Sequence, residues 1–261
     1  MKSLFLPSCG ATVRFHDLPG SGPVRVFLHG LGSAASADLP EVALHSPGPP
    51  RRWIAPDLLG FGFSDAPAEF PYTIDAHSRV VAALLDHLQV RRAEVLGHSM
   101  GGSVAIALAR ERPDLISALA IAEGNLDPGG GFVSVPIATQ PEDEFTHQGH
   151  QLFIDRLRSA AESDASLATY IGTARRSASH ALHRSSVSLV AVNLRKAFLA
   201  LDLPRAFIIG GRSTPEAAWK ELAEKGIPVL TVPNAGHAMF LDNPDGFAHA
   251  LEQAFGASSS A

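Results

Sequence analysis

Two short stretches of this sequence carry residue types that could together break an acyl bond. Gly97-His98-Ser99-Met100-Gly101 places a serine between two glycines, and His237 lies in NAGHAMFLDNP, residues 234–244. A serine hydroxyl becomes a nucleophile when a histidine takes its proton, and histidine can take up and return a proton near neutral pH. The pair predicts nucleophilic attack on a carbonyl carbon, provided that the fold brings Ser99 and His237 together.

A third stretch, VFLHGLGSA (residues 26–34), could stabilise the charge that this attack creates. A strand followed by a loop of small residues can present a main-chain N–H to a developing oxyanion. We expect the N–H groups of Leu31 and Met100 to form such an oxyanion hole. The side chain of His29 is expected to bond nearby backbone instead.

Each of these stretches follows a predicted strand. Ser99 lies between a strand at 92–97 and a helix at 101–112, so it is predicted on a sharp strand-to-helix turn where small neighbours let backbones approach. The His29 loop follows a strand at 24–29, and His237 follows a strand at 228–233. Apolar periodicity and breakers predict further strands at 4–15, 51–56, 116–124 and 205–211, and further helices at 74–89, 215–226 and 244–255.

Strands that alternate with helices predict a mostly parallel sheet covered on both faces. Residues 127–200 interrupt the alternation with a turn-rich start, DPGGGF, and then helical patterns. We therefore expect one α/β core from residues 1–126 and 201–261, with 127–200 inserted as a helical lid. Apolar lid residues are expected to contact the substrate, namely Phe132, Val133, Phe145 and Phe153.

Composition narrows the class of protein. The 261 residues are 46% hydrophobic and 18% charged, and the net charge of −5 argues against nucleic-acid binding. No apolar run reaches the ~18 residues of a membrane span, and the first residues make a poor signal peptide, so a cytoplasmic protein is expected. The single cysteine, Cys9, and the isolated pair His147 and His150 predict no metal site. No cofactor is expected.

Four motifs in this order resemble the α/β-hydrolase family over nearly the whole chain: FLHGLGSA, APDLLGFGFSD (residues 55–65), GHSMGG and NAGHAMFLDNP. The resemblance implies an eight-stranded sheet and a catalytic triad in the order serine, acid, histidine. It also implies a structural role for Asp57.

The acid departs from the family pattern, because its commonest position falls at Ser213. A hydroxyl cannot supply the negative charge that stabilises a histidinium. Glu123 is the favoured replacement, since it follows the wholly apolar run 118–122 on a strand expected beside both the Ser99 strand and the 205–211 strand. Asp127 and Glu216 remain alternatives.

The favoured function is a cofactor-free serine hydrolase acting on a small-molecule carboxylic ester or lactone. The same triad could instead cleave a carbon–carbon bond or an amide. Dehalogenation and epoxide opening are disfavoured, because relatives with those activities need a carboxylate where this chain has Ser99. A slow or inactive ligand receptor of the same fold is the alternative outside catalysis.

Overall fold

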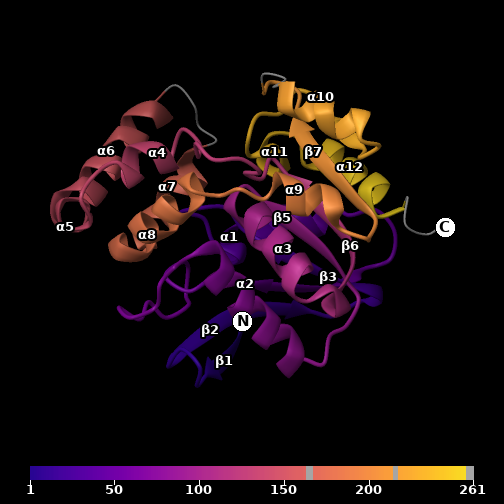
Figure 1. Cartoon of the computed structure of the whole chain (residues 1–261), viewed down its shortest axis with the longest axis horizontal. Helices are drawn as coiled ribbons and strands as arrows, with labels where there is room; N and C mark the ends of the chain where they lie inside the picture. The colour runs from indigo at the N-terminus through magenta and orange to yellow at the C-terminus, as the bar shows by residue number, and fades with distance from the viewer. Residues whose placement is uncertain (163–166, 214–216, 257–261) are drawn as a thin grey trace.

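Figure 1 shows a computed structural model of the chain, which describes residues 1–162, 167–213 and 217–256. Within these residues the strands form one eight-stranded sheet in the order β1-β2-β4-β3-β5-β6-β7-β8. The strands are β1 (Lys2–Leu6), β2 (Ala11–Leu18), β3 (Ser21–Leu28), β4 (Arg51–Pro56), β5 (Ala93–His98), β6 (Ile116–Ala122), β7 (Arg205–Gly210) and β8 (Val229–Val232).

The pairings β1–β2 and β2–β4 are antiparallel, and all the others are parallel. The carboxyl ends of β3, β5, β6, β7 and β8 therefore lie at one edge of the sheet. Functional sites in open α/β sheets form at this edge, beside the point where the strand order reverses. Here the order reverses around β3, which pairs with β4 on one side and with β5 on the other.

Helices cover both faces of the sheet. They are α1 (Ala35–Leu44), α2 (Ile74–His87), α3 (Met100–Glu111), α4 (Ser134–Ala138), α5 (Glu142–Glu144), α6 (His150–Ala161), α7 (Leu167–Arg176), α8 (Ser179–Val190), α9 (Arg195–Ala200), α10 (Ala217–Glu224), α11 (Met239–Asp242) and α12 (Pro244–Gly256). A 3-10 turn, Pro113–Leu115, precedes β6, and a π-helical turn, Phe145–Gly149, joins α5 to α6.

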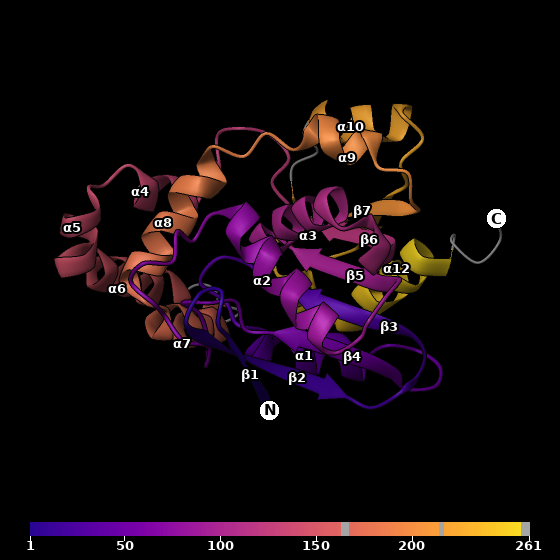
Figure 2. The ribbon, with the colours of Figure 1, turned by 60° about the horizontal axis from the view of Figure 1, so that its bottom comes forward.

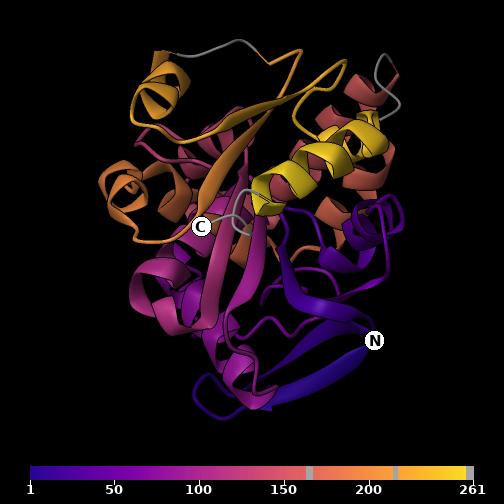
Figure 3. The ribbon, with the colours of Figure 1, turned by 90° about the vertical axis from the view of Figure 1, so that its right-hand side faces the viewer.

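The two faces carry separate apolar cores. Side chains of α2 and α3 pack on one face, where Val104 and Leu84 are fully buried. Side chains of α1, α11 and α12 pack on the other face, around Phe27 and Phe247. Figure 3 shows the yellow C-terminal helix α12 on the opposite side of the sheet from the orange helices α9 and α10. Burial on both faces fixes the sheet and hence the positions of the loops at its edge.

The helices α4–α8 gather at one end of the molecule, away from β7 and α12 (Figures 1 and 2). The chain enters and leaves this region at one place, because the N–H groups of Leu194 and Arg195 both donate to the carbonyl of Leu126, over 2.7 and 3.0 Å. We propose 127–200 as a lid. Its last helix, α9, lies over the core, where Phe198 packs edge-on against Phe207 of β7.

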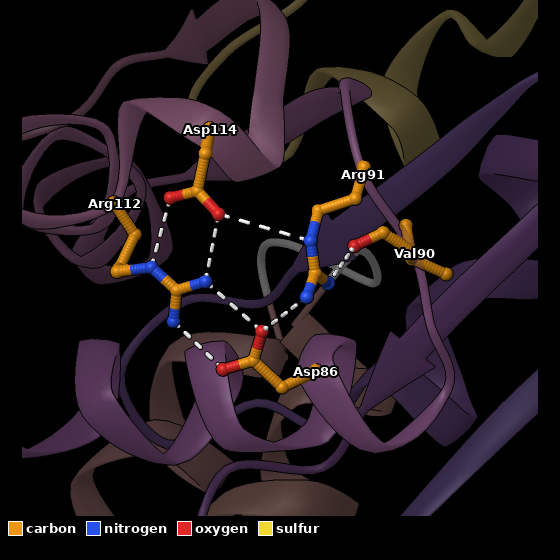
Figure 4. A network of polar contacts seen from close by, with 5 residues as sticks. All are labelled: Asp86, Val90, Arg91, Arg112 and Asp114. Atoms are coloured by element: carbon orange, nitrogen blue, oxygen red, sulfur yellow. Dashed lines mark hydrogen bonds and ion pairs between the residues drawn. The ribbon is translucent and has the colours of Figure 1, made fainter.

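A surface network ties the ends of α2 and α3 together (Figure 4). The guanidinium of Arg112 contacts both oxygens of Asp86, over 2.7 and 2.9 Å, and also pairs with Asp114. Arg91 contacts Asp86 as well. These groups are largely exposed, so screening by solvent keeps the contribution of each pair to stability small. The network helps to hold the C-terminal end of α3 against the C-terminal end of α2.

The predicted elements are found with boundary shifts of a few residues, with two exceptions. The predicted strand 4–15 is two antiparallel strands, β1 and β2, because the chain turns at 7–10 and Gly10 adopts a φ of +60°. Helix α1 was not predicted, since Pro40 lies inside it and no side chain caps its first turn. No helix within the described ranges is long and apolar enough to cross a bilayer.

Candidate active site

Ser99 occupies the turn between β5 and α3. Its φ of 52° and ψ of −121° are rarely adopted by a residue with a side chain. The turn is held by the N–H of Ser99, which donates to the Ala122 carbonyl over 2.9 Å, and by the N–H of Gly102, which donates to the Ser99 carbonyl over 2.8 Å. The side chain is half-buried and lines a cavity of about 1000 Å³.

The glycines on either side of Ser99 are required by close backbone contacts. A Cβ atom on Gly97 would lie 2.4 Å from the carbonyl oxygen of Gly101. A Cβ atom on Gly101 would lie 2.1 Å from the carbonyl oxygen of Leu28 in β3. Both distances are far below van der Waals contact, so the spacing of the motif reflects the packing of α3 against β3 and β5.

His237 lies in the loop between β8 and α11 and contacts Glu123. Its Nδ1 is 2.7 Å from Oε2 of Glu123, and both residues line the cavity with Ser99. A hydrogen bond between these atoms places the proton on Nδ1 and leaves Nε2 as the acceptor of the neutral ring. This is the tautomer that a general base for a serine hydroxyl requires.

Glu123 directly follows β6 and has a φ of 47°. Its second oxygen, Oε1, accepts hydrogen bonds from the Ser213 hydroxyl over 2.6 Å and from the Gly210 N–H over 2.8 Å. Burial alone would raise the pKa of Glu123, but the hydrogen bonds, that from His237 foremost, stabilise the anion and lower the pKa to about 2. Glu123 is therefore a carboxylate at neutral pH.

Of the other two acid candidates, only Asp127 lies within the described residues, and it does not contact His237. Asp127 pairs with Arg195, with an Nη2–Oδ2 distance of 2.6 Å. Glu216 lies outside the described residues. Ser213, where the family usually has its acid, is a hydrogen-bond donor to Glu123.

The loop after β3 lies against the Ser99 turn. A Cβ atom on Gly30 would lie 3.2 Å from the Cβ of Ser99, so this loop borders Ser99. Within the described part of the chain, no acceptor pairs with the main-chain N–H of Leu31 or Met100. Leu31 lines the cavity, and Met100 is the first residue of α3, a position whose N–H has no partner within the helix.

The side chain of His29 is structural, as expected. Its Nε2 accepts from the N–H of Leu58 over 3.0 Å, and its Nδ1 lies 2.8 Å from the Gly30 carbonyl. Asp57 is also structural, because its carboxylate accepts from the N–H and hydroxyl of Ser36 and from the N–H of Phe63. These bonds shape the turn after β4 and the loop after β3, which we propose as the oxyanion loop (residues 29–34).

Two residues that sequence reasoning missed hold these loops in place. His98 is buried, its Nε2–H donates to the His237 carbonyl over 2.9 Å, and burial lowers its pKa to about 3, so the ring stays neutral. From the lid, the hydroxyl of Tyr170 donates to the Leu31 carbonyl over 3.1 Å. Only tertiary contacts reveal either role. The place of His98 beside the nucleophile was the one signal in the sequence.

Two of the four predicted substrate-contact residues line the cavity. Phe132 is 75% exposed and its ring meets the His237 ring edge-on, with centroids 5.9 Å apart, and Val133 is beside it. The prediction for Phe145 and Phe153 was wrong. Phe145 is fully buried inside the lid between His150 and His183, and Phe153 packs on the apolar core. The apolar residues of this region serve mainly to assemble the proposed lid, although Leu157 lines the cavity.

Comparisons with known proteins agree with this fold. The profile of the α/β-hydrolase fold family matches residues 23–179. The chain is 34% identical over 136 residues to 2-hydroxymuconate semialdehyde hydrolase of Pseudomonas sp. (strain CF600), covering 50% of this chain but only 44% of that protein. It is 27% identical over 228 residues to haloalkane dehalogenase 2 of Mycobacterium tuberculosis (strain ATCC 25618 / H37Rv), covering 78% and 79%.

Among solved structures, the enol-lactonase from Burkholderia xenovorans LB400 superposes with a TM-score of 0.82 at 23% identity, covering 98% of this chain and 100% of that one. At this identity the likeness concerns the fold alone. The profile match extends over more than half of the chain, and the protein therefore belongs to the α/β-hydrolase fold family.

Proposed function

We propose that the protein is a serine hydrolase that cleaves a carboxylic ester or lactone through an acyl-enzyme on Ser99. The observation that carries the proposal is the 2.7 Å contact between His237 Nδ1 and Glu123 Oε2, at the wall of the cavity that Ser99 lines. A buried, ionised carboxylate on Nδ1 gives the histidine both the tautomer and the electrostatic support that a general base needs.

In the first half-reaction, Ser99 Oγ attacks the carbonyl carbon while His237 Nε2 takes the hydroxyl proton. The carbonyl oxygen becomes an oxyanion, which accepts hydrogen bonds from the N–H groups of Leu31 and Met100. Glu123 stabilises the histidinium without taking its proton. The carbon–oxygen bond to the leaving group then breaks, and His237 returns the proton to the departing alcohol.

In the second half-reaction, water attacks the acyl carbon and His237 accepts a proton from it. The second tetrahedral intermediate collapses, Ser99 Oγ leaves and takes the proton from His237, and the carboxylic acid is released. With a lactone, the alcohol stays tethered to the acyl group, so the single product is a hydroxy acid. Neither route needs a cofactor.

Features of the cavity support a partly apolar substrate. Phe132, Val133 and Leu157 line it from the lid, and a volume of about 1000 Å³ is ample for a small ester or lactone. The fold shared with the enol-lactonase is compatible with such a substrate.

Hydrolysis of a carbon–carbon bond is the second candidate, favoured by the likeness to 2-hydroxymuconate semialdehyde hydrolase. The same triad and oxyanion hole would serve, with a carbon leaving group in place of an alkoxide. The likeness to a haloalkane dehalogenase carries less weight, because Ser99 stands where dehalogenases of this fold have a carboxylate. The receptor hypothesis rested on the missing carboxylate at Ser213, and Glu123 supplies that charge.

The test combines a fluorophosphonate probe with steady-state hydrolysis of a short p-nitrophenyl ester. The wild type should be labelled once per chain and should turn over the ester. Ser99→Ala should lose both the label and the turnover. Ser46→Ala is the matched control, because the Ser46 hydroxyl bonds the Val42 carbonyl outside the cavity, and it should behave as the wild type. Full esterase activity in Ser99→Ala would refute the proposal.

A further inference from the structure

Asp38 contributes a carboxyl group to the wall of the cavity. The proposed mechanism does not use this group. It lies in the first turn of α1, just after the oxyanion loop, and is only 3% exposed. The hydroxyl of Ser33 donates to its Oδ2 over 2.6 Å. Asp38 and Ser33 both line the cavity that contains Ser99.

The second oxygen of Asp38, Oδ1, has no partner among the residues that the structure describes. Within the described residues, no hydrogen bond or ion pair reaches Oδ1, yet this atom is not sealed from the cavity. Asp57, nineteen residues further on, offers a direct contrast, because its buried carboxylate accepts three hydrogen bonds and does not line the cavity. Three hydrogen bonds compensate the cost of burying the Asp57 carboxylate. Asp38 accepts only the bond from Ser33, which leaves its Oδ1 free to bind a group in the cavity.

Burial without a cation is costly for a carboxylate. Burial foremost, with repulsion from Asp57, raises the pKa of Asp38 to about 7 despite the hydrogen bond from Ser33. Burial raises the pKa of Tyr170 in the lid, and the negative charge of Asp38 raises it further. A buried acid that faces a cavity with an unused oxygen is typical of a functional group rather than a structural one.

We propose that Asp38 is a specificity-determining residue that hydrogen-bonds a neutral hydroxyl or amide group of the substrate, on the side of the cavity that Tyr170 covers. The inference rests on the proposed function and specifies its substrate class: an ester or lactone with a polar, uncharged group away from the reacting carbonyl. A half-ionised carboxyl suits such a group, because it accepts a hydrogen bond when ionised and can donate one when protonated. A substrate carboxylate would be repelled by Asp38 and Asp57.

The experiment compares p-nitrophenyl esters that share a leaving group. They are the hexanoate, the 3-hydroxy- and 6-hydroxyhexanoates, the 6-acetamidohexanoate and the 6-aminohexanoate. The quantity measured is kcat/KM for each polar ester divided by kcat/KM for the hexanoate. In the wild type, at least one hydroxy or acetamido ester should exceed the hexanoate, and the amino ester should not.

Asp38→Leu should lower that ratio about tenfold, the size of one good hydrogen bond. Asp38→Asn should keep most of it, because the carboxamide still offers an acceptor and a donor. Asp38→Ala gives a second apolar variant should the leucine impair folding. Asp75→Asn is the matched control, an acidic residue in the first turn of α2 that pairs with Arg110 outside the cavity, and it should leave the ratio unchanged.

Three results would overturn the inference while leaving ester hydrolysis intact. They are a wild type that prefers no neutral polar ester, a preference that survives in Asp38→Leu and Asp38→Ala, and a preference for the amino ester above all others. Failure of the proposed function gives a different result, since the wild type would then hydrolyse none of the esters and would not be labelled by the fluorophosphonate.

Discussion

The hydroxyl of Ser213 donates a 2.6 Å hydrogen bond to Oε1 of Glu123, whose other oxygen contacts His237. The residue at the family's usual acid position thus supports a carboxylate that comes from the neighbouring strand. The register explains how this is possible, because β6 and β7 are parallel neighbours and Ala122 pairs with Ile208. The residues that follow the two strands therefore meet at the same edge of the sheet.

This relationship predicts that an aspartate at position 213 can replace Glu123 as the partner of His237. Glu123→Gln should lower kcat strongly, and adding Ser213→Asp in that background should recover at least tenfold, because the new carboxylate lies within reach of His237. In the wild-type background, Ser213→Asp should lower activity, since two adjacent carboxylates repel each other. Ester hydrolysis by the three variants checks this. No recovery in the double variant would argue against a shared acid position.

The surroundings of two helical glycines, Gly101 beside Ser99 and Gly172 in α7, predict opposite effects of alanine on the free energy of unfolding. Gly101→Ala should cost more than about 2 kcal/mol of unfolding free energy, because its Cβ would lie 2.1 Å from the Leu28 carbonyl oxygen. Gly172→Ala in α7 meets nothing within 4 Å and should gain about 0.5–1 kcal/mol through helix propensity. Urea denaturation of both variants decides the matter. A tolerated alanine at 101 would contradict the described packing.

The sequence predicts those site residues whose position follows from secondary structure, and it does not predict those whose role depends on contacts between distant loops. Ser99, His237 and Glu123 could be located because each follows a strand, and parallel strands end at one edge. The support from Ser213 and His98 could not be predicted, because hydrogen bonds between loops far apart in the chain leave no periodic signal.

The misreadings have physical causes as well. Apolar residues occur on both sides of the turn at 7–10, so two strands were read as one. A phenylalanine inside an inserted helical region can equally face a cavity or a helix neighbour, and Phe145 faces His183. Asp38 was not identified because helix α1 was not predicted, and the burial of its side chain follows from tertiary packing.

The lid tyrosine is expected to affect catalysis through the oxyanion loop. Tyr170→Phe removes the hydrogen bond to the Leu31 carbonyl and should lower kcat about two- to tenfold with a smaller change in KM. Tyr72→Phe is the control, since its hydroxyl bonds the Pro67 carbonyl away from the cavity and kcat should not change. Steady-state kinetics that give equal effects for both variants would remove Tyr170 from the positioning of this loop.

Asp38 should make stability depend on pH in a defined direction. Its pKa is raised from 3.8 to about 7, so the folded state holds this proton more tightly than the unfolded state does. The stability that results is fully present below about pH 4 and is lost as the pH rises to about 7. Asp38→Asn should therefore raise Tm relative to wild type at pH 8 and by less at pH 4. Thermal unfolding at the two values tests this. A Tm difference independent of pH would contradict the raised pKa.

The most direct test of the proposed triad is the rate of ester hydrolysis by Glu123→Gln beside Asp127→Asn and Glu216→Gln. Glutamine keeps the size of the side chain but removes the charge that stabilises the His237 imidazolium. We predict a fall in kcat of about 10³–10⁴-fold for Glu123→Gln and near wild-type rates for the other two. Near wild-type activity in Glu123→Gln, or a comparable loss in Asp127→Asn or Glu216→Gln, would contradict the assignment of Glu123 as the catalytic acid.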